Sequence, residues 1–339
     1  MNGNKHVMGL CVVLGLLLAS LVVGGTPVAA NSNTYEYYVE GNAGDVTTPT
    51  QAGLVLMGGS TDVDSAFEWM IERSGGGDFV VIRASGTDAY NPWIYADLGG
   101  VDSAETIVIL KPEVAQDPFV IDKIRNAEAL FIAGGNQWNY VRLWKGTPVE
   151  DAIQYVAAKG APVGGTSAGL AVLGEFSFSA EKGTIVSKNA LNNPYQPRVA
   201  LENDFLHLPY LGSVITDSHF VARDRMGRLI TFLARIVNDG WAGQARGIGI
   251  NERTALVVDR HGIATLHGEG PVYFLQTPGL PEVCEKSTPL TYQDLAVYRL
   301  SEPGAQFDLA EWSSDEGTAY TLSAEEGVLS STQAGGGIY

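Results

Sequence analysis

The 339-residue chain has 38 Asp and Glu against 21 Lys and Arg, which gives a formal net charge of −17 at pH 7. This surplus of acids argues against a nucleic-acid-binding protein, because neutralising phosphates takes clustered cations. The proportions of hydrophobic and charged residues, 45% and 17%, exclude an intrinsically disordered chain.

The first 30 residues have the pattern of an export signal. A long apolar run follows the first six residues, and the small residues Val28 and Ala30 occupy the two positions that a signal peptidase reads. We expect residues 1–30 to be cleaved, which leaves a secreted or periplasmic protein, free of the membrane, that begins with a weakly structured leader at 31–50. An uncleaved anchor is the alternative, because about 18 apolar residues span a bilayer.

Short apolar segments alternate with segments of helical spacing from residue 53 onwards. The expected strands lie at 53–59, 78–85, 105–110, 129–135 and 161–166. The expected helices between them lie at 63–74, 119–126 and 148–159. This alternation is typical of βαβ units. It predicts an α/β fold with a doubly wound, mostly parallel sheet flanked by helices, and a site at the carboxyl ends of the strands.

The second half of the chain has a different pattern. A long helix is expected over 219–237, followed by strands at 247–250 and 254–259 and by further short strands. We take these as C-terminal strands added to the same domain, which then covers residues 51–312. Residues 313–339 are rich in Ser, Gly, Glu and Thr, and we expect them to form a flexible tail.

The segment from Gly165 to Gly169 reads G-T-S-A-G and is the only G-x-S-x-G motif of the sequence. It stands where an expected strand ends and a helix should begin. A serine at the centre of this motif lies on a sharp turn that exposes its hydroxyl, so Ser167 is a candidate nucleophile. The sequence contains 41 glycines, so an ordinary glycine-rich turn is the alternative.

A serine nucleophile needs a base to take its proton, and histidine is the usual one. After the predicted signal, the sequence offers His207, His219, His261 and His267. His219 follows the apolar segment L-G-S-V-I and is therefore expected at the end of a strand, as Ser167 is. It is the best candidate for the base.

Arg223, Arg225 and Arg228 follow His219 closely in a chain that is poor in cations. Guanidinium groups bind carboxylates in bidentate fashion, so this cluster predicts a substrate with an acidic group. A solvated helix face whose arginines pair with surface acids is the alternative.

An acyl-transfer site also needs two N–H donors for the oxyanion of its intermediate. The amide of Ala168, next to the candidate nucleophile, supplies one. The sharp turn A-G-G-N-Q at 133–137 supplies another through Gly135 and brings the Gln137 side chain to the same crevice. The alternative is a tight loop between a strand and a helix.

Several motifs together resemble the cyanophycinases and, more distantly, the aspartyl dipeptidase called peptidase E. They are A-G-G-N-Q (133–137), G-G-T-S-A-G (164–169), D-S-H-F-V-A-R-D-R-M-G-R-L (217–229), G-I-G-I-N-E-R-T-A (247–255) and L-T-Y-Q-D-L-A-V-Y-R-L (290–300). The resemblance implies a serine peptidase on a flavodoxin-like fold related to class I glutamine amidotransferases. It also implies a homodimer.

The resemblance assigns roles to individual residues. It implies Ser167 as nucleophile, His219 as general base and then acid, and Glu252 as the carboxylate that orients the imidazole. Glu175 is a second candidate for this third role. The residues that the resemblance assigns to the substrate cleft are Gln137, Asp217, Arg223, Arg225 and Arg228.

The resemblance implies a substrate as well. Cyanophycin is a polyaspartate with arginine on each side-chain carboxyl, and the family cleaves its backbone to release β-aspartyl-arginine. Ser218 stands where cyanophycinases have Gln, and Asn136 where they have Asp. Cyanophycin or a related aspartyl peptide is therefore the expected substrate, with an α-aspartyl or isoaspartyl dipeptidase as the alternative.

Two other interpretations remain. An α/β-hydrolase esterase would carry its acid between serine and histidine, at Asp204 or Asp217, with His261 or His267 as base. A secreted binding protein would keep the fold without turnover. The sequence has neither an H-E-x-x-H motif nor paired cysteines, so we expect no metal and no cofactor.

Overall fold

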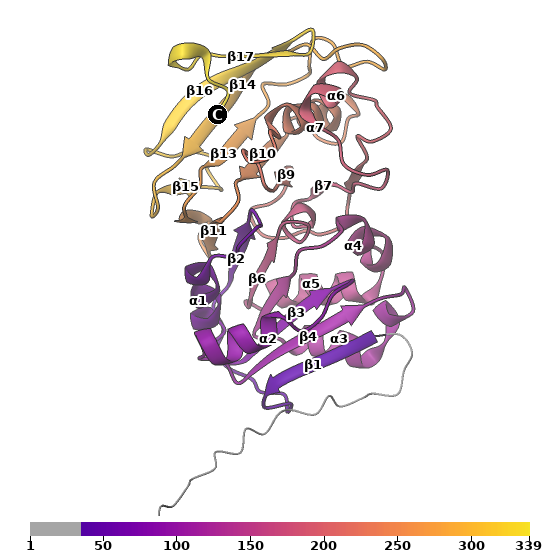
Figure 1. Cartoon of the computed structure of the whole chain (residues 1–339), viewed down its shortest axis with the longest axis vertical. Helices are drawn as coiled ribbons and strands as arrows, with labels where there is room; N and C mark the ends of the chain where they lie inside the picture. The colour runs from indigo at the N-terminus through magenta and orange to yellow at the C-terminus, as the bar shows by residue number, and fades with distance from the viewer. Residues whose placement is uncertain (1–34) are drawn as a thin grey trace, which may run out of the picture.

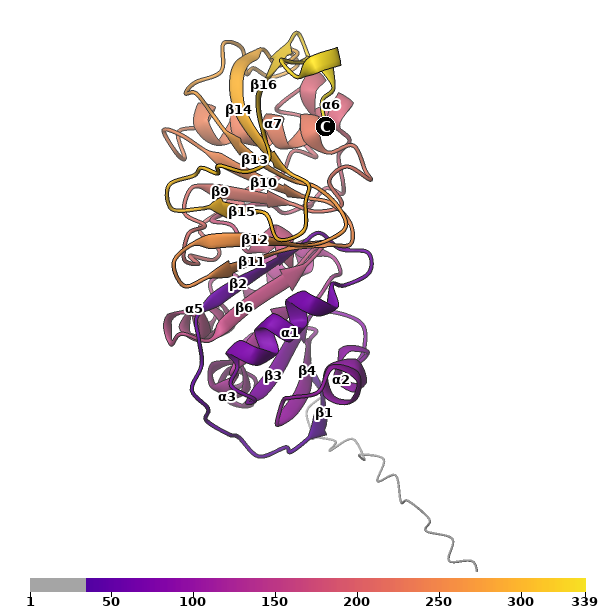
Figure 2. The same cartoon turned by 90° about the vertical axis from the view of Figure 1, so that its left-hand side faces the viewer.

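The computed structural model describes residues 35–339, so the predicted signal peptide at residues 1–30 lies outside the described part. The described chain contains two β-sheets that follow each other along the long axis of the molecule (Figures 1 and 2). No helix within residues 35–339 has the length and apolar character needed to cross a bilayer.

The first sheet has nine strands within the described residues. In spatial order they are β1 (Tyr35–Gly41), β4 (Ser103–Ile109), β3 (Asp78–Arg83), β5 (Ala129–Ile132), β6 (Pro162–Thr166), β2 (Gly53–Met57), β11 (Thr254–Asp259), β12 (Ile263–Gly268) and β15 (Gln306–Asp308). Strands β4, β3, β5, β6 and β2 are parallel, and antiparallel strands flank them on both sides.

Local sequence defines where several helices begin. The side chain of Asp117 accepts a hydrogen bond from the Phe119 amide at 2.9 Å, and Asn136 accepts one from the Trp138 amide at 3.1 Å. The helices are α1 (Asp64–Arg73), α2 (Tyr90–Pro92), η1 (Trp93–Leu98), η2 (Val114–Gln116), α3 (Pro118–Asn126), α4 (Gln137–Trp144), α5 (Pro148–Ala158), η3 (Leu170–Val172), α6 (Ser187–Asn192), α7 (Met226–Asn238) and η4 (Ala334–Gly336).

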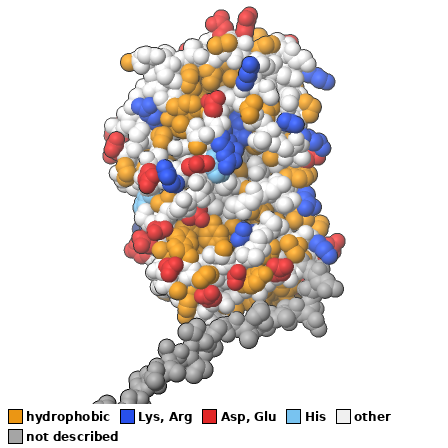
Figure 3. All heavy atoms as spheres, in the orientation of Figure 1, with side chains coloured by type: hydrophobic (Ala, Val, Ile, Leu, Met, Phe, Trp, Pro, Cys, Tyr) orange, Lys and Arg blue, Asp and Glu red, His pale blue; other side chains and the backbone are white. Residues whose placement is uncertain are grey.

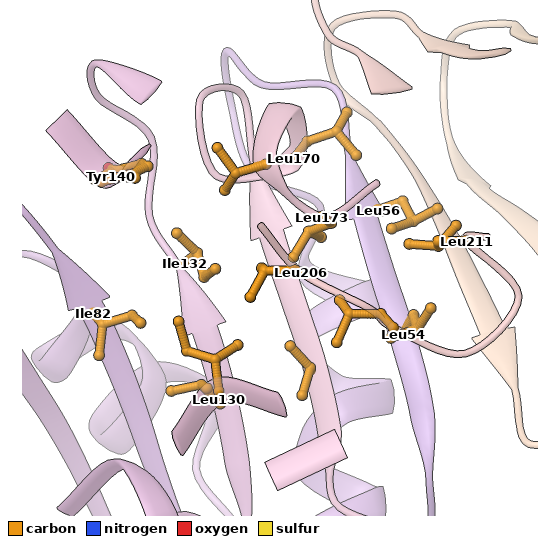
Figure 4. Close-up of a cluster of buried hydrophobic side chains, with 14 of the residues drawn as sticks. Leu54, Leu56, Ile82, Leu130, Ile132, Tyr140, Leu170, Leu173, Leu206 and Leu211 are labelled. Atoms are coloured by element: carbon orange, nitrogen blue, oxygen red, sulfur yellow. The ribbon is translucent and has the colours of Figure 1, made fainter. Parts of the chain in front are cut away.

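Both faces of the first sheet are buried. Alternate residues of a strand point to opposite faces, and in β2 both Leu54 and Val55 lie in hydrophobic clusters, one on each side. Helix α1 covers the face of Val55, while α3 and α5 cover the face of Leu54. On that second face, Leu170 and Leu173 pack with the strands and anchor the segment that follows Ser167 (Figure 4). Helices on both faces of a largely parallel sheet confirm the predicted fold class.

The second sheet contains most of the C-terminal strands. In spatial order it consists of β17 (Val328–Ser331), β16 (Thr318–Glu325), β14 (Tyr292–Leu300), β13 (Val272–Gln276), β10 (Arg246–Ile250), β9 (Val214–Asp217), β7 (Phe176–Phe178) and β8 (Leu201–Asn203). Helix α7 packs closely on it, because a β-carbon at Gly247 would lie 3.2 Å from both Leu229 and Leu233. The expected C-terminal strands are confirmed, but they are divided between the two sheets.

Two segments expected to be weakly structured form strands instead. Within the expected leader at 31–50, β1 pairs with β4, and the ring of Tyr37 packs edge-on against Phe119 at 5.0 Å. Within the expected tail at 313–339, β16 pairs with both β14 and β17. Both predictions were wrong because a strand needs only alternate apolar residues, which a polar composition conceals.

Three buried carboxyl groups lie near the amino ends of β3, β4 and β5. The Ser103 hydroxyl lies 2.7 Å from an oxygen of Asp78 and 3.0 Å from one of Glu105, while the Asp78 amide donates to Glu128 at 3.0 Å. Burial raises the pKa of Glu128 to about 7, although the ammonium group of Lys159 lies 4.0 Å away. The folded state therefore favours the protonated form of this acid.

Glu128 should make the protein less stable as the pH rises. Its folded pKa lies above the ordinary value of 4.5, so its contribution is fully present below pH 4.5 and is lost as the pH rises through about 7. Glu128→Gln should remove this dependence and exceed the wild type in free energy of unfolding by roughly 2 kcal/mol near pH 8. Urea denaturation at acid and alkaline pH checks this, with the exposed Glu113→Gln as control. Parallel pH dependence in wild type and Glu128→Gln would contradict it.

Candidate active site

Ser167 lies on a tight turn directly after β6. Its backbone is left-handed, with φ of 54°, and its amide donates to the carbonyl of Met57 at 3.0 Å. A β-carbon at Gly165 would lie 2.7 Å from the Gly169 backbone, and one at Gly169 would lie 2.0 Å from the Ile132 carbonyl oxygen. The turn closes only with glycine at both positions, which explains the G-x-S-x-G pattern.

His219 lies beside this serine. It follows β9, and its Nε2 is 2.8 Å from the Ser167 hydroxyl oxygen. The imidazole is buried, and the His219 amide donates to the Gly58 carbonyl at 2.8 Å. A β-carbon at Gly59 would lie 2.8 Å from Nε2 and 2.9 Å from the Ser167 β-carbon. Sequence reasoning missed Gly59, whose only signal is the pair of glycines after an apolar strand.

Glu252 completes a chain of hydrogen bonds. It lies in the loop between β10 and β11, and its Oε1 is 2.7 Å from Nδ1 of His219. Because a carboxylate only accepts, Nδ1 carries the proton and Nε2 has a free lone pair for the proton of Ser167. Strands β9 and β10 are parallel neighbours, so the residues after them lie close together.

Burial lowers the pKa of His219, and the cations of Arg223 and Arg225 lower it further, against the opposing effect of Glu252. The imidazole is therefore neutral at pH 7, which is the form that can accept a proton.

The second candidate for the third role, Glu175, lies elsewhere. It accepts a hydrogen bond from the Ser213 amide at 2.5 Å and lines a different cavity, next to His207. The structure therefore brings Glu252, and not Glu175, to the imidazole.

Within residues 35–339, the other histidines make no hydrogen bond with Ser167. His207 is paired with Asp204 at 2.9 Å, and Nδ1 of His267 lies 2.9 Å from the Ser65 hydroxyl. His261 is exposed in its turn. The arrangement of an α/β-hydrolase esterase, with His261 or His267 as base, is thus contradicted.

Ser167 and His219 open into a cavity of about 290 Å³. Apolar side chains of Phe178, Ile185 and Val186 line this cavity together with the arginines. The guanidinium group of Arg228 lies over the ring of Phe178, at 5.0 Å. Figure 3 shows Lys or Arg side chains gathered beside a histidine near the middle of the face of the molecule that it draws. The cavity therefore offers both positive charge and apolar surface next to Ser167.

Asp217 lies behind the arginines rather than in the cavity. Its buried carboxylate accepts from Arg225 Nη1 at 3.2 Å and from Arg228 Nε at 2.7 Å, and it also accepts from Nη2 of Arg228. The expectation that Asp217 faces the substrate cleft is corrected, because both oxygens are taken up by guanidinium groups that do line the cavity. Asp217 therefore orients Arg225 and Arg228.

Arg223 and Arg225 differ in exposure. Arg223 is exposed at the cavity, with its Nε 3.9 Å from Glu252 Oε1. Burial lowers the pKa of Arg225 to about 10, so its guanidinium remains charged at neutral pH. The helix expected at 219–237 begins only at Met226, because residues 219–225 form the loop that presents these arginines.

Gly135 and Ala168 both line the cavity. Among the described residues, neither amide donates to a protein acceptor. Gln137 lies at the edge, where its side-chain amide donates to the Phe178 carbonyl at 3.2 Å. Asn136, which stands where cyanophycinases have Asp, caps the N-terminus of α4 with its side chain.

The sequence pattern of Peptidase family S51 matches residues 94–266, just over half of the chain. The chain belongs to this family.

Among curated proteins, the S51 chain is similar to cyanophycinase from Trichormus variabilis (strain ATCC 29413 / PCC 7937), with 28% identity over 207 residues, 60% of this chain and 64% of the relative. Cyanophycinase from Synechococcus elongatus is 25% identical over 230 residues, 68% of this chain and 63% of that protein. The S51 chain thus spans just under two thirds of the length of these relatives.

A solved structure shares the fold of the S51 chain. A peptidase from an acI-B1 Actinobacterium matches with a TM-score of 0.50 and 18% identity, over 66% of this chain and 91% of that chain. The family match and the curated relatives confirm the expected resemblance to the cyanophycinases. The region matched by the S51 pattern includes Ser167, His219 and Glu252 and ends within β12, so the later strands lie outside it.

No group of three or more His, Cys, Asp and Glu side chains between residues 35 and 339 is arranged to hold a metal ion. What the S51 chain itself brings to the cavity is a hydroxyl, an imidazole, backbone amides and guanidinium groups.

The acid limb of the pH profile of kcat/KM should lie below pH 6.5, the ordinary pKa of histidine, because the pKa of His219 is lowered. Arg223→Gln removes one of the cations that lower it, so the limb should move to higher pH. Hydrolysis rates across the acid range check this. Arg198→Gln, which removes an exposed cation elsewhere, should leave the limb in place, and a limb above pH 7 in the wild type would contradict the prediction.

Proposed function

We propose that the chain is a serine peptidase that hydrolyses cyanophycin or related aspartyl peptides through Ser167, His219 and Glu252. The observation that carries this proposal is the hydrogen-bonded series from the Ser167 hydroxyl through His219 to Glu252, at 2.8 Å and 2.7 Å, beside a cluster of arginines. Membership of Peptidase family S51 and similarity to cyanophycinases support it.

In the first half of the reaction, Ser167 Oγ attacks the scissile carbonyl carbon, and its proton passes to Nε2 of His219. Glu252 stabilises the imidazolium that forms. The amides of Ala168 and Gly135 donate to the oxyanion of the tetrahedral intermediate. The carbon–nitrogen bond then breaks, and His219 gives its proton to the leaving amine, which leaves an ester on Ser167.

In the second half, a water molecule replaces the amine. His219 takes one proton from the water as its oxygen attacks the ester carbonyl, and the same two amides bind the second oxyanion. The carbon–oxygen bond to Ser167 breaks, and the proton on His219 returns to the serine oxygen. The products are a carboxylic acid and the free enzyme.

The charges around the cavity support an acidic substrate group. Arg225 and Arg228 share the single carboxylate of Asp217, so this cluster keeps a net positive charge. A free α-carboxylate, such as those of the arginyl residues in cyanophycin, would bind to these guanidinium groups. The net charge of −17 would tolerate a polymer that carries arginine side chains.

An α-aspartyl or isoaspartyl dipeptidase is the second candidate function. Two observations favour it. Among the described residues, the arginines line the cavity and no carboxylate lines it to receive a substrate guanidinium. Ser218 also stands where the resembled family has Gln, and its hydroxyl accepts from Arg225 at 3.2 Å.

Incubation with three substrates distinguishes these functions. Cyanophycin, isoaspartyl dipeptides and α-aspartyl peptides are each mixed with the protein, and the products are identified by mass. Release of β-aspartyl-arginine from cyanophycin supports the first proposal, and hydrolysis of the dipeptides alone supports the second. If no substrate is cleaved and an organophosphonate does not label Ser167, the protein is a non-catalytic binder.

We also propose that the protein acts outside the cytoplasm after cleavage near residue 30, for which the apolar N-terminal segment is the support. The N-terminal residue of the protein recovered from the medium or periplasm, determined by mass spectrometry, tests this.

A further inference from the structure

The loop from His219 to Arg225 carries two of the cavity's arginines. It is left-handed at His219, with φ of 47°, and at Asp224, with φ of 48°. Two of its internal hydrogen bonds join the Arg223 amide to the His219 carbonyl and the Arg225 amide to the Phe220 carbonyl, both at 3.0 Å. A loop with such a conformation needs support from other parts of the chain.

The first turn of α7, which follows this loop, is capped from outside. Arg225 at the cap position makes no capping hydrogen bond with its side chain. The Met226 amide instead donates to the hydroxyl oxygen of Tyr339 at 3.0 Å, and the Arg228 amide donates to the hydroxyl oxygen of Ser187 at 3.1 Å. Two hydroxyl groups remote in sequence thus replace the missing cap.

Tyr339 also holds the loop itself. Its hydroxyl donates to Asp224 Oδ1 at 2.9 Å, so one oxygen joins the loop to the start of α7. The ring packs edge-on against Phe220 at 6.1 Å and Tyr273 at 5.7 Å. Burial raises the pKa of Tyr339 well above its usual range, so the hydroxyl keeps its proton and remains a donor.

The strands of the expected tail bring Tyr339 to this position. Tyr320 of β16 donates to the Ile338 carbonyl at 3.0 Å, and the Gln333 side chain donates to the Gly337 carbonyl at 2.7 Å. Hydrogen bonds within residues 320–339 therefore hold the end of this segment in place next to the loop. It lies outside residues 94–266, where the chain matches its family.

We propose that Tyr339 is a positioning residue that holds Arg223 and Arg225 in place for the substrate carboxylate. The inference rests on the proposed function. Ser167 and His219 have further supports outside the loop: the Ser167 amide donates to the Met57 carbonyl, the His219 amide donates to the Gly58 carbonyl, and the His219 side chain binds Glu252. Loss of the Tyr339 hydroxyl should therefore weaken substrate binding more than it slows the chemical step.

The test uses Tyr339→Phe in the full chain, which keeps the ring and removes the hydroxyl. We expect KM for the cleaved aspartyl substrate to rise roughly tenfold and kcat to stay within about twofold. Amide hydrogen exchange in residues 220–228 should become faster, and organophosphonate labelling of Ser167 should keep its rate. Tyr292→Phe is the matched control, because the Tyr292 hydroxyl, on β14, donates to the Gly279 carbonyl at 2.6 Å and not to the loop.

A second pair of variants separates positioning from a general loss of structure. Asp224→Asn keeps an acceptor and tolerates the left-handed backbone, so its KM should remain near that of the wild type. Asp224→Ala should raise KM, and adding Tyr339→Phe to it should raise KM by a smaller factor than Tyr339→Phe does alone, because both changes remove the Tyr339–Asp224 hydrogen bond.

Three results would overturn the proposal: an unchanged KM in Tyr339→Phe, an equal fall of kcat and labelling rate, or faster exchange spread over the whole chain. If the wild type cleaves none of the peptides, the proposed function fails. In that case, unchanged exchange at 220–228 in Tyr339→Phe rejects the contact, while faster exchange confined to these residues supports it.

Discussion

Replacing Ser167 by alanine should lower kcat by a factor of about 10⁴ or more on whichever aspartyl substrate the protein cleaves. In the proposed mechanism this hydroxyl is the group that attacks, and no other hydroxyl is hydrogen-bonded to His219 in the described chain. The measurement is the rate of product release by mass spectrometry at saturating substrate. The melting temperature should change little, because alanine removes one oxygen at the edge of an open cavity.

The chain offers a matched control for this variant. Ser65 forms a second serine–histidine hydrogen bond, with His267 at 2.9 Å on the protein surface, so Ser65→Ala should leave kcat unchanged. His219→Ala combined with Ser167→Ala should be no slower than either change alone, because the two side chains act as a unit. Substantial turnover by Ser167→Ala would reject the proposed nucleophile.

The positions of Ser167 and His219 can be anticipated because each follows an apolar segment, and this property is local in sequence. Glu252 is different. Its local sequence fits a surface acid paired with Arg253 or Arg260 equally well, and only the family resemblance singled it out. The hydrogen bond to His219 arises because β9 and β10 are parallel neighbours, which local sequence does not reveal.

The features missed from sequence are tertiary. Gly59 is needed because the end of β2 passes within contact distance of His219 and Ser167, which depends on how the two sheets meet. The tail at 313–339 forms strands because β14 provides a pairing edge nearly twenty residues earlier in the chain. Tyr339 reaches the loop of Asp224 only through that pairing.

Asp217 shows the same limitation for charged residues. Asp217 is close in sequence to the arginines that follow His219, and the family resemblance places the acid and the arginines in the same substrate cleft. In the structure, Asp217 is buried, and both oxygens of its carboxylate are paired with the guanidinium groups of Arg225 and Arg228, so neither oxygen is available to a substrate. Arg225 and Arg228 therefore line the cavity, and Asp217 does not.

Asp217→Asn should therefore be among the most destabilising changes in the protein. It removes the only carboxylate that the structure places against Arg225 and Arg228, and breaking a buried ion pair from one side costs about 3–5 kcal/mol. KM should rise as well, because the guanidinium groups that line the cavity lose the carboxylate that orients them both. Urea denaturation and substrate titration of the same preparation measure both effects.

Two further variants make this prediction specific. Asp239→Asn removes the carboxylate of a partly exposed pair with Arg235 at 2.7 Å, and it should cost less than about 1 kcal/mol. Adding Arg228→Met to Asp217→Asn should recover part of the lost stability, because it removes one of the buried charges left without a partner. It should not recover KM, because the cavity then lacks that guanidinium. Equal destabilisation by Asp217→Asn and Asp239→Asn would show that the buried cluster is not what holds the arginines.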